Sequence, residues 1–317
     1  MSSGSDTPEA MRLNGREVSD DAPREGLLAL AALLTDRGLH YGDGLFETIA
    51  CIGGEPRFLE EHMRRLALGC ERLAIDVVSH GERNALIEDI VRLAAGHQRA
   101  IIKAIVTRGP ATARGYAPRG DERPSRIVLR YEWPHEDPHA AIEGVRARLS
   151  EFTLAENPRL AGLKHLNRLE LVLARAELAG SGADEALLLS RSGCLVSGTM
   201  SNVFIVSGAR ITTPRLDRCG VAGVMREVLM REAAAAGIGI EETRLTRQDV
   251  EAADEIFLTN VRIGIRPVRV LGSRELGAGP RTRHLQRLIE PRLAAREAQS
   301  AQRADAASGA QTLRGPR

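Results

Sequence analysis

The chain has 317 residues, of which 43% are hydrophobic and 27% are charged, a balance typical of a folded globular protein large enough for two domains. Its 44 basic and 42 acidic residues leave a net charge of only +2, and aromatic residues make up 3%, so nothing indicates nucleic-acid binding. No apolar run could cross a membrane, the first residues lack the features of a signal peptide, and the four cysteines have no metal-ligand or disulfide spacing. We therefore expect a cytoplasmic protein with reduced thiols and no metal site.

The first part of the chain predicts a tail followed by a small domain. Residues 1–9 are small and polar and are predicted to be disordered, and an Asn-Gly pair at 14–15 predicts a tight hairpin turn. Residues 27–34 are apolar and fit either a strand or a short helix. The glycine-rich residues 36–44 predict a turn. The rest of this domain, 10–132, is predicted as a strand at 45–52, a Gly-Gly hairpin at 53–54, helices at 59–73 and 82–95, and strands at 100–107 and 127–132.

Prolines in 133–140 predict a linker, followed by a second domain at 141–298 and a disordered tail at 299–317. A loop that ends at Lys164 is followed by a helix to about Leu178, with a predicted apolar face of Leu166, Leu169, Val172, Leu173 and Ala176. The remaining predictions are strands at 145–150, 185–189, 254–260 and 267–270, a strand ending near Arg244, a helix ending at Ala236, a helix cap at 246–249 and a final helix at 281–298.

Lysine is rare in this sequence, which makes each lysine informative. Only Lys103 and Lys164 occur, and every other basic residue among the 44 is arginine. An amine can lose its proton on burial and attack a carbonyl to form a Schiff base, whereas a guanidinium stays charged and cannot. A retained lysine therefore indicates amine chemistry. The residues alone leave two candidates, one in the predicted strand 100–107 and one in the loop before a helix.

The segment around Lys164 resembles a known family. Residues 157–170 read Asn-Pro-Arg-Leu-Ala-Gly-Leu-Lys-His-Leu-Asn-Arg-Leu-Glu and are similar to the cofactor-lysine segment of the 4-amino-4-deoxychorismate lyases. These are fold-type IV pyridoxal-phosphate (PLP) enzymes, related to the branched-chain and D-amino-acid aminotransferases. The resemblance covers roughly residues 10–295. It implies an α+β fold with a small N-terminal α/β domain and a larger domain built on a mixed, barrel-like sheet, and it implies a homodimer.

The same resemblance implies how the cofactor is held. It assigns the Schiff base and the general acid/base role to Lys164 rather than to Lys103, and it assigns a phosphate contact to Arg65 within His-x-x-Arg-Leu. A second close match spans residues 211–226, where a Gly-x-x-Gly motif opens a helix. Free N–H groups at a helix start bind phosphate, so Gly223, Val224 and Met225 are candidate ligands. Asn260 belongs to the last phosphate-contacting turn.

One position departs from the family pattern. Ser197 opens the segment Ser-Gly-Thr-Met-Ser-Asn-Val-Phe, and most of the superfamily has a glutamate there that pairs with the pyridine nitrogen of PLP. Its neighbours Gly198 and Thr199 are also candidate cofactor contacts. A carboxylate keeps the ring a pyridinium, whereas a serine offers a neutral hydrogen bond. The ring should therefore be a weaker electron sink in this chain.

Substrate contacts are also implied by the resemblance. Arg114 and Tyr116 lie in an Arg-Gly-Tyr loop similar to that of the lyases, and an arginine fork suits a carboxylate. Phe46 stands where D-amino-acid aminotransferases have a tyrosine, and Thr48 follows on the same strand. The implied reaction converts 4-amino-4-deoxychorismate to 4-aminobenzoate and pyruvate. Three alternatives are an aminotransferase for branched-chain or D-amino acids, a PLP-binding relative without turnover, and a binding module without PLP.

Overall fold

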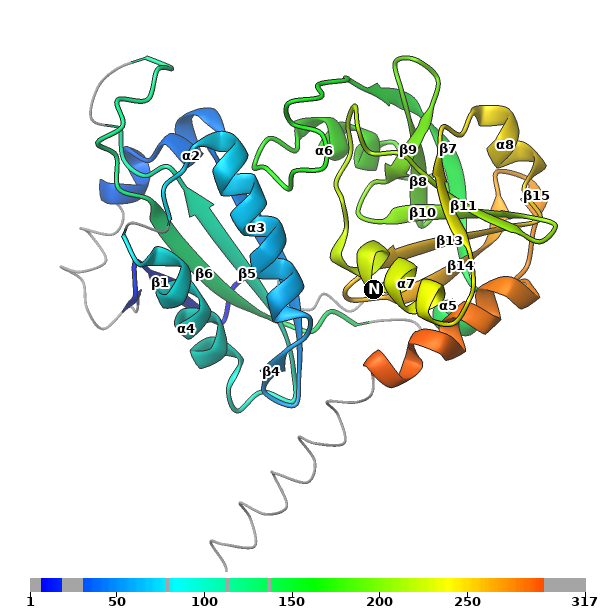
Figure 1. The fold of residues 1–317 in the computed structure, drawn as a ribbon, viewed down its shortest axis with the longest axis horizontal. Helices are drawn as coiled ribbons and strands as arrows, with labels where there is room; N and C mark the ends of the chain where they lie inside the picture. The colour runs from blue at the N-terminus through cyan, green and yellow to red at the C-terminus, as the bar shows by residue number, and fades with distance from the viewer. Residues whose placement is uncertain (1–6, 19–30, 78–79, 112–114, 136–137, 294–317) are drawn as a thin grey trace, which may run out of the picture. The chain divides into compact units, whose positions relative to one another are not determined.

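The computed structural model describes residues 7–18, 31–77, 80–111, 115–135 and 138–293. They form two compact units, drawn in Figure 1. The first unit contains the described residues of Met1–Cys70, Ala74–His135 and Glu290–Arg317, and the second contains those of Glu71–Leu73 and Glu136–Ile289. The main division thus falls inside the segment 133–140, and the end of the last helix belongs to the first unit.

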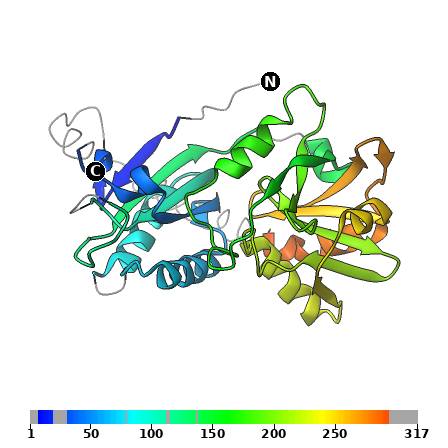
Figure 2. The same cartoon turned by 90° about the horizontal axis from the view of Figure 1, so that it is seen from above.

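The first unit is built on one antiparallel sheet with helices on one face. The strand order is β2-β1-β6-β5-β3-β4, with β1 at Ala10–Leu13, β2 at Arg16–Glu17, β3 at Gly44–Ile52, β4 at Glu55–Pro56, β5 at Arg99–Thr107 and β6 at Ser125–Glu132. Helices α3 (Leu59–Leu73) and α4 (Glu82–Ala94) lie on the same face of this sheet in both views (Figures 1 and 2). Leu45 of β3 packs directly under Gly69 of α3, where a Cβ would come within 2.7 Å of it.

Local sequence signals predicted much of this unit. The turn between β1 and β2 has positive φ at Asn14 (49°) and Gly15 (82°), which confirms the Asn-Gly hairpin, and α3 has the predicted bounds. The turn predicted at 36–44 was incomplete, because it contains the short helix α2 (Arg37–Tyr41). The side chain of Asp36 caps this helix by accepting from the Gly38 N–H at 2.7 Å. Residues 31–34 are helical, and 27–30 lie outside the described residues.

The second unit is built on a mixed, curled sheet, as the resemblance implied. Its order is β12-β11-β10-β13-β14-β7-β8-β9, with β15 added to β14. The strands are β7 (Val145–Leu154), β8 (Glu185–Ser190), β9 (Leu195–Gly198), β10 (Asn202–Ser207), β11 (Arg210–Pro214), β12 (Ile240–Thr243), β13 (Glu255–Asn260), β14 (Gly264–Leu271) and β15 (Arg274–Glu275). β7 pairs in parallel with both β8 and β14, and β11 with β12, whereas the other pairs are antiparallel. The helices are α5 (Pro138–Ile142), α6 (Leu169–Ala176), α7 (Val224–Ala235), α8 (Arg247–Ala252) and one at 280–293.

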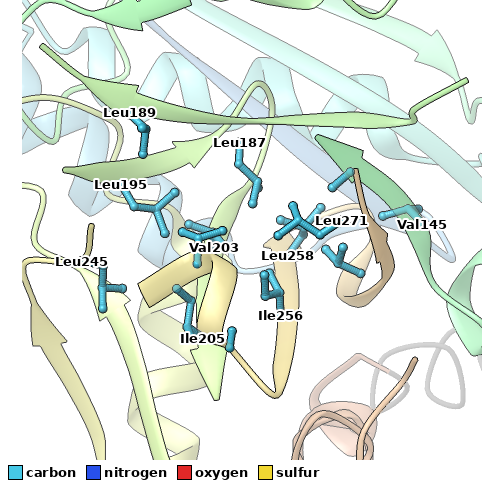
Figure 3. Close-up of a cluster of buried hydrophobic side chains, with 14 residues drawn as sticks. Val145, Leu187, Leu189, Leu195, Val203, Ile205, Leu245, Ile256, Leu258 and Leu271 are labelled. Atoms are coloured by element: carbon cyan, nitrogen blue, oxygen red, sulfur yellow. The ribbon is translucent and has the colours of Figure 1, made fainter. Parts of the chain in front are cut away.

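Apolar side chains from strands far apart in the sequence fill the inside of this curl (Figure 3). Leu187, Leu195, Val203 and Leu258 are each at most 2% exposed there. The short helix α8 adds Val250 to the cluster, and its start carries the predicted cap, with Thr246 and Asp249 bonded reciprocally. The core therefore fixes the sheet, and the segments at its rim carry the candidate site.

The predicted apolar face of α6 is wrong. Leu169, Val172 and Leu173 are 69%, 59% and 49% exposed, and Ala176 is exposed as well. The helix packs instead through Ala174 and Leu171 against Leu154, Leu188 and Val196. Helical spacing identifies an apolar stripe but not the element that covers it, and here no other part of the described chain does so. None of the described helices combines the length and apolarity required to span a bilayer.

Candidate active site

The loop that carries Lys164 is bound along its length to the segment that precedes α7. The Asn157 N–H donates to the Arg218 carbonyl at 2.8 Å, and the Gly162 N–H donates to the Gly220 carbonyl at 2.9 Å. In return, the Ala222 N–H donates to the Gly162 carbonyl at 3.0 Å. These main-chain bonds join two segments about 60 residues apart, the two that most resemble the family. Lys164 follows Gly162 by two residues, so its main chain lies beside the start of α7.

The start of α7 offers unsatisfied main-chain donors. Gly223 is the N-cap residue, and no side chain caps the helix there. The first N–H groups of a helix have no partner within the helix and carry a partial positive charge. A Cβ at Gly223 would come within 1.9 Å of Oδ1 of Asn202, so the main chain approaches this amide more closely than any other residue would allow. The N–H groups of Val224 and Met225 follow directly.

Two more predicted segments meet at the same place. Nδ2 of Asn202 donates to the Val221 carbonyl at 2.9 Å, which holds the β9–β10 region against the α7 loop. Thr259 lies directly opposite Asn202 on β13, so both side chains face the same side of the sheet. Oγ1 of Thr259 is buried and has no hydrogen-bond partner among the described residues. Asn260 uses its side chain for the turn, donating to the Met200 carbonyl at 3.2 Å and accepting from the Ile263 N–H at 3.0 Å.

The segment at 197–201 is organised around a carboxylate that the sequence did not single out. Glu185, at the start of β8, accepts from the Thr199 N–H at 3.0 Å and from the Ser201 hydroxyl at 3.0 Å. A Cβ at Gly198 would lie only 2.9 Å from the same carboxylate. Ser197 is 8% exposed on β9 and is a neutral group, as predicted from its type. An acidic residue opening the buried strand 185–190 was the available signal for Glu185.

These donors suit an anionic cofactor with an aldehyde. The uncapped helix start and the unpartnered Thr259 hydroxyl suit a phosphate, and Lys164 is the amine that can bind an aldehyde carbon. The close main-chain approach at Gly223 leaves those N–H groups accessible rather than covered by a side chain. The described residues hold no cluster of His, Cys, Asp and Glu suited to a metal ion. The second unit therefore fits PLP.

Beside Lys164, His165 is held in its neutral form. Its Nδ1 is buried and has no hydrogen-bond partner among the described residues. Burial, with a smaller contribution from the charge of Arg168, lowers the pKa of His165 from 6.5 to about 4. The imidazole is therefore uncharged at neutral pH and adds no positive charge next to the candidate nucleophile.

In the first unit, Arg65 is paired with a buried carboxylate. Its Nε donates to Oε1 of Glu47 at 2.8 Å, a second guanidinium nitrogen donates to Oε2, and Nδ1 of His62 lies 2.6 Å from the same Oε2. Burial raises the pKa of Glu47, but the opposing effects of Arg65 and His62 prevail and lower it to about 2. Glu47 is therefore ionised and orients Arg65.

The predicted substrate residues of the first unit lie in two places. Phe46 and Thr48 are half-buried on β3, where Thr48 pairs with Lys103 and the Lys103 Nζ lies 5.5 Å from the centre of the Phe46 ring. Tyr116 is 82% exposed, and its carbonyl accepts from Nη2 of Arg37 at 2.6 Å. Arg114 lies outside the described residues.

Comparison with known proteins identifies the family. Residues 44–271 match the family described as amino-transferase class IV. The chain belongs to this family. The expected fold-type IV architecture is thereby confirmed, and the family uses PLP. A solved branched-chain amino acid aminotransferase from T.th., 25% identical with a TM-score of 0.77, contains pyridoxamine 5′-phosphate and covers 92% of this chain and 95% of its own.

Both predicted activities occur among similar proteins. An aminodeoxychorismate lyase from Vibrio harveyi is 31% identical, over 80% of this chain and 93% of its own. A putative branched-chain-amino-acid aminotransferase from Methanocaldococcus jannaschii is 33% identical, over 84% of this chain and 90% of its own. The crystal structure of 4-amino-4-deoxychorismate lyase from Pseudomonas aeruginosa is 39% identical with a TM-score of 0.78, covering 88% of this chain and 97% of its own.

Proposed function

We propose that this protein is a PLP-dependent lyase that converts 4-amino-4-deoxychorismate to 4-aminobenzoate and pyruvate, a folate precursor step. The observation that carries the proposal is the bonding of the Lys164 loop to the start of α7, through Gly162, Gly220 and Ala222. It brings an amine and an anion-binding helix start together. The 39% identity to the lyase from Pseudomonas aeruginosa supports this reaction over others.

In this proposal each candidate residue has one role. The N–H groups of Gly223, Val224 and Met225, with Asn260 and Arg65, would hold the phosphate; Ser197, Gly198 and Thr199 would line the ring; and Arg114, Tyr116, Phe46 and Thr48 would contact the substrate. When bound, PLP withdraws electrons from the carbon that bears the substrate nitrogen. Lys164 would hold the cofactor covalently and, once released, take the proton from that carbon as a general base. Loss of the enolpyruvyl group as pyruvate then leaves an aromatic ring.

The neutral Ser197 fits an elimination better than a reaction that must hold charge on the ring for long. Serine cannot keep the ring nitrogen protonated as a glutamate would, so electron withdrawal is weaker. Formation of an aromatic product supplies driving force that an amino-group exchange lacks. A Ser197→Glu variant should therefore gain side transamination. Unchanged elimination without any such gain would count against this account.

The test is pyruvate release from freshly prepared 4-amino-4-deoxychorismate by the PLP-loaded wild type and by Lys164→Ala. Release that requires Lys164 supports the lyase. A wild type that binds PLP but releases no pyruvate would reject it, and the protein would then be a PLP-binding relative or act on other substrates.

A second candidate is an aminotransferase for branched-chain or D-amino acids. The 33% identity to the putative branched-chain enzyme of Methanocaldococcus jannaschii favours it specifically. It requires amino-group exchange between an amino acid and a 2-oxo acid, again dependent on Lys164. Measuring both activities on one preparation separates the two candidates, because only the lyase releases pyruvate without an amino acceptor.

The proposal includes a cytoplasmic homodimer, and one surface supports the dimer. Leu169, Val172 and Leu173 form an exposed apolar stripe on α6, a few residues after Lys164. Apolar patches of this kind commonly mark protein interfaces. Light scattering of the wild type and of Val172→Asp tests this, since a charge on the stripe should yield monomers. A monomeric wild type would reject the dimer.

A further inference from the structure

Arg168 occupies a position where an arginine is a poor choice for the helix. It is the N-cap residue of α6, with φ −120° and ψ 14°, and its side chain makes no cap hydrogen bond. Ser, Thr, Asp and Asn are preferred at N-caps because their oxygens accept from the first N–H groups. A guanidinium has donors only. A local rule broken in this way indicates that the side chain serves another purpose.

The side chain turns back over the two residues that flank Lys164. Nε of Arg168 donates to the His165 carbonyl at 2.7 Å, and Nη2 donates to the Leu163 carbonyl at 3.1 Å. One rigid guanidinium thus bonds to the carbonyls on both sides of Lys164. A lysine at this position has a single compact ammonium and no planar fork, so it could not reproduce both bonds in the same geometry.

The two ends of this loop are held in different ways. Before Lys164, main-chain bonds at Asn157 and Gly162 tie the loop to the α7 segment. After Lys164, the imidazole of His165 has no partner for its buried Nδ1 among the described residues. The bonds from Arg168 fix the carbonyls at 163 and 165, and with them the main-chain dihedrals of Lys164. These dihedrals set the direction in which the lysine side chain leaves the loop.

We propose that Arg168 is a positioning residue that fixes the main chain of Lys164 so that its amine is presented to the cofactor. The proposal rests on the proposed role of Lys164 as the cofactor lysine. Its structural part concerns only the loop, so it can be tested without cofactor.

The sequence provides a clean assay of the loop. A lysine-specific endoproteinase has only two possible sites, Lys103 within β5 and Lys164 in the loop. Cleavage after Lys164 reports local release of the loop, whereas cleavage after Lys103 requires unfolding of the first unit's sheet. The variants are Arg168→Lys and Arg168→Gln. The matched control is Arg274→Lys, because Arg274 also donates to two main-chain carbonyls, those of Glu251 and Ala253, in the same unit.

In the cofactor-free protein, we expect cleavage after Lys164 to rise about tenfold in both Arg168 variants, with cleavage after Lys103 unchanged. With PLP, we expect weaker binding and a smaller visible circular dichroism signal of the bound cofactor, which reports its fixed orientation. Arg274→Lys should match the wild type in each measurement. Unchanged cleavage after Lys164 would overturn the proposal, as would raised cleavage with wild-type PLP affinity and dichroism. A wild type that fails to bind PLP would reject the proposed function, while the cleavage comparison would still decide whether Arg168 holds the loop.

Discussion

The two lysines of this chain lie in main-chain environments of opposite kinds. Lys103 is in the middle of β5, paired with Thr48 on one side and Leu129 on the other. Lys164 is in an irregular segment bonded to the α7 loop, and its flanking carbonyls accept from Arg168. Sheet pairing gives Lys103 the same direction as any other residue of its row. The direction of Lys164 is set by contacts particular to its loop, which is how a reactive group is aimed.

The largest expected effect separates the two lysines directly. Lys164→Ala should remove the covalent bond to PLP and lower turnover by about 10³-fold or more, because both the amine nucleophile and the base are lost. Lys103→Ala should keep the bond. Borohydride reduction followed by peptide mass spectrometry locates the cofactor. A label on Lys103 in the wild type would reverse the comparison.

The sheet of the first unit should depend on one carboxylate. Glu47→Gln leaves the buried Arg65 and His62 without their anion, so the free energy of unfolding should fall by about 3–5 kcal/mol. Urea denaturation measures this, with the exposed Glu88→Gln as control, expected within about 0.5 kcal/mol of the wild type. The Glu47 pKa of about 2 lies below its usual 4.5, so its contribution is present above pH 4.5 and disappears as the pH falls toward 2. Equal effects of the two variants would contradict this prediction.

The loop of the second unit should depend instead on close main-chain approach. Gly223→Ala would place a methyl group within 1.9 Å of Oδ1 of Asn202, so we expect a loss of about 1–3 kcal/mol in stability and weaker PLP binding. Gly239→Ala is the control, because a Cβ there meets no atom within 4 Å. Isothermal titration with PLP measures the binding. Wild-type affinity in Gly223→Ala would show that the helix start does not hold the phosphate.

The smallest effect concerns the pH dependence of stability at His165. Because its folded pKa of about 4 lies below 6.5, the unfolded chain takes up a proton between these values that the folded chain does not. Folding stability therefore decreases as the pH falls from 6.5 to 4. In His165→Asn the decrease should be shallower than in the wild type or in the exposed control His80→Asn. Denaturation midpoints at several pH values measure this, and parallel curves for all three proteins would refute it.

The same contrast explains what the sequence could predict. Elements defined by neighbours along the chain, such as the Asn14-Gly15 turn, helix α3 and the cap of α8, carry their signals within a few residues. The covered face of α6 and the bonds of Glu185 depend on partners distant in sequence, so spacing alone could not reveal them. The family resemblance named the four site segments of the second unit. Their meeting at the start of α7, and the backward turn of Arg168, required the fold.

The near absence of lysine has a further consequence for an aldehyde cofactor. Free PLP condenses with accessible primary amines in general, and a guanidinium cannot react in this way. Neither Lys103 nor Lys164 is fully exposed, and the chain has no other lysine. Its surface thus offers the aldehyde almost no bystander amines, which gives this protein an intrinsic chemical selectivity for loading the cofactor at a single position.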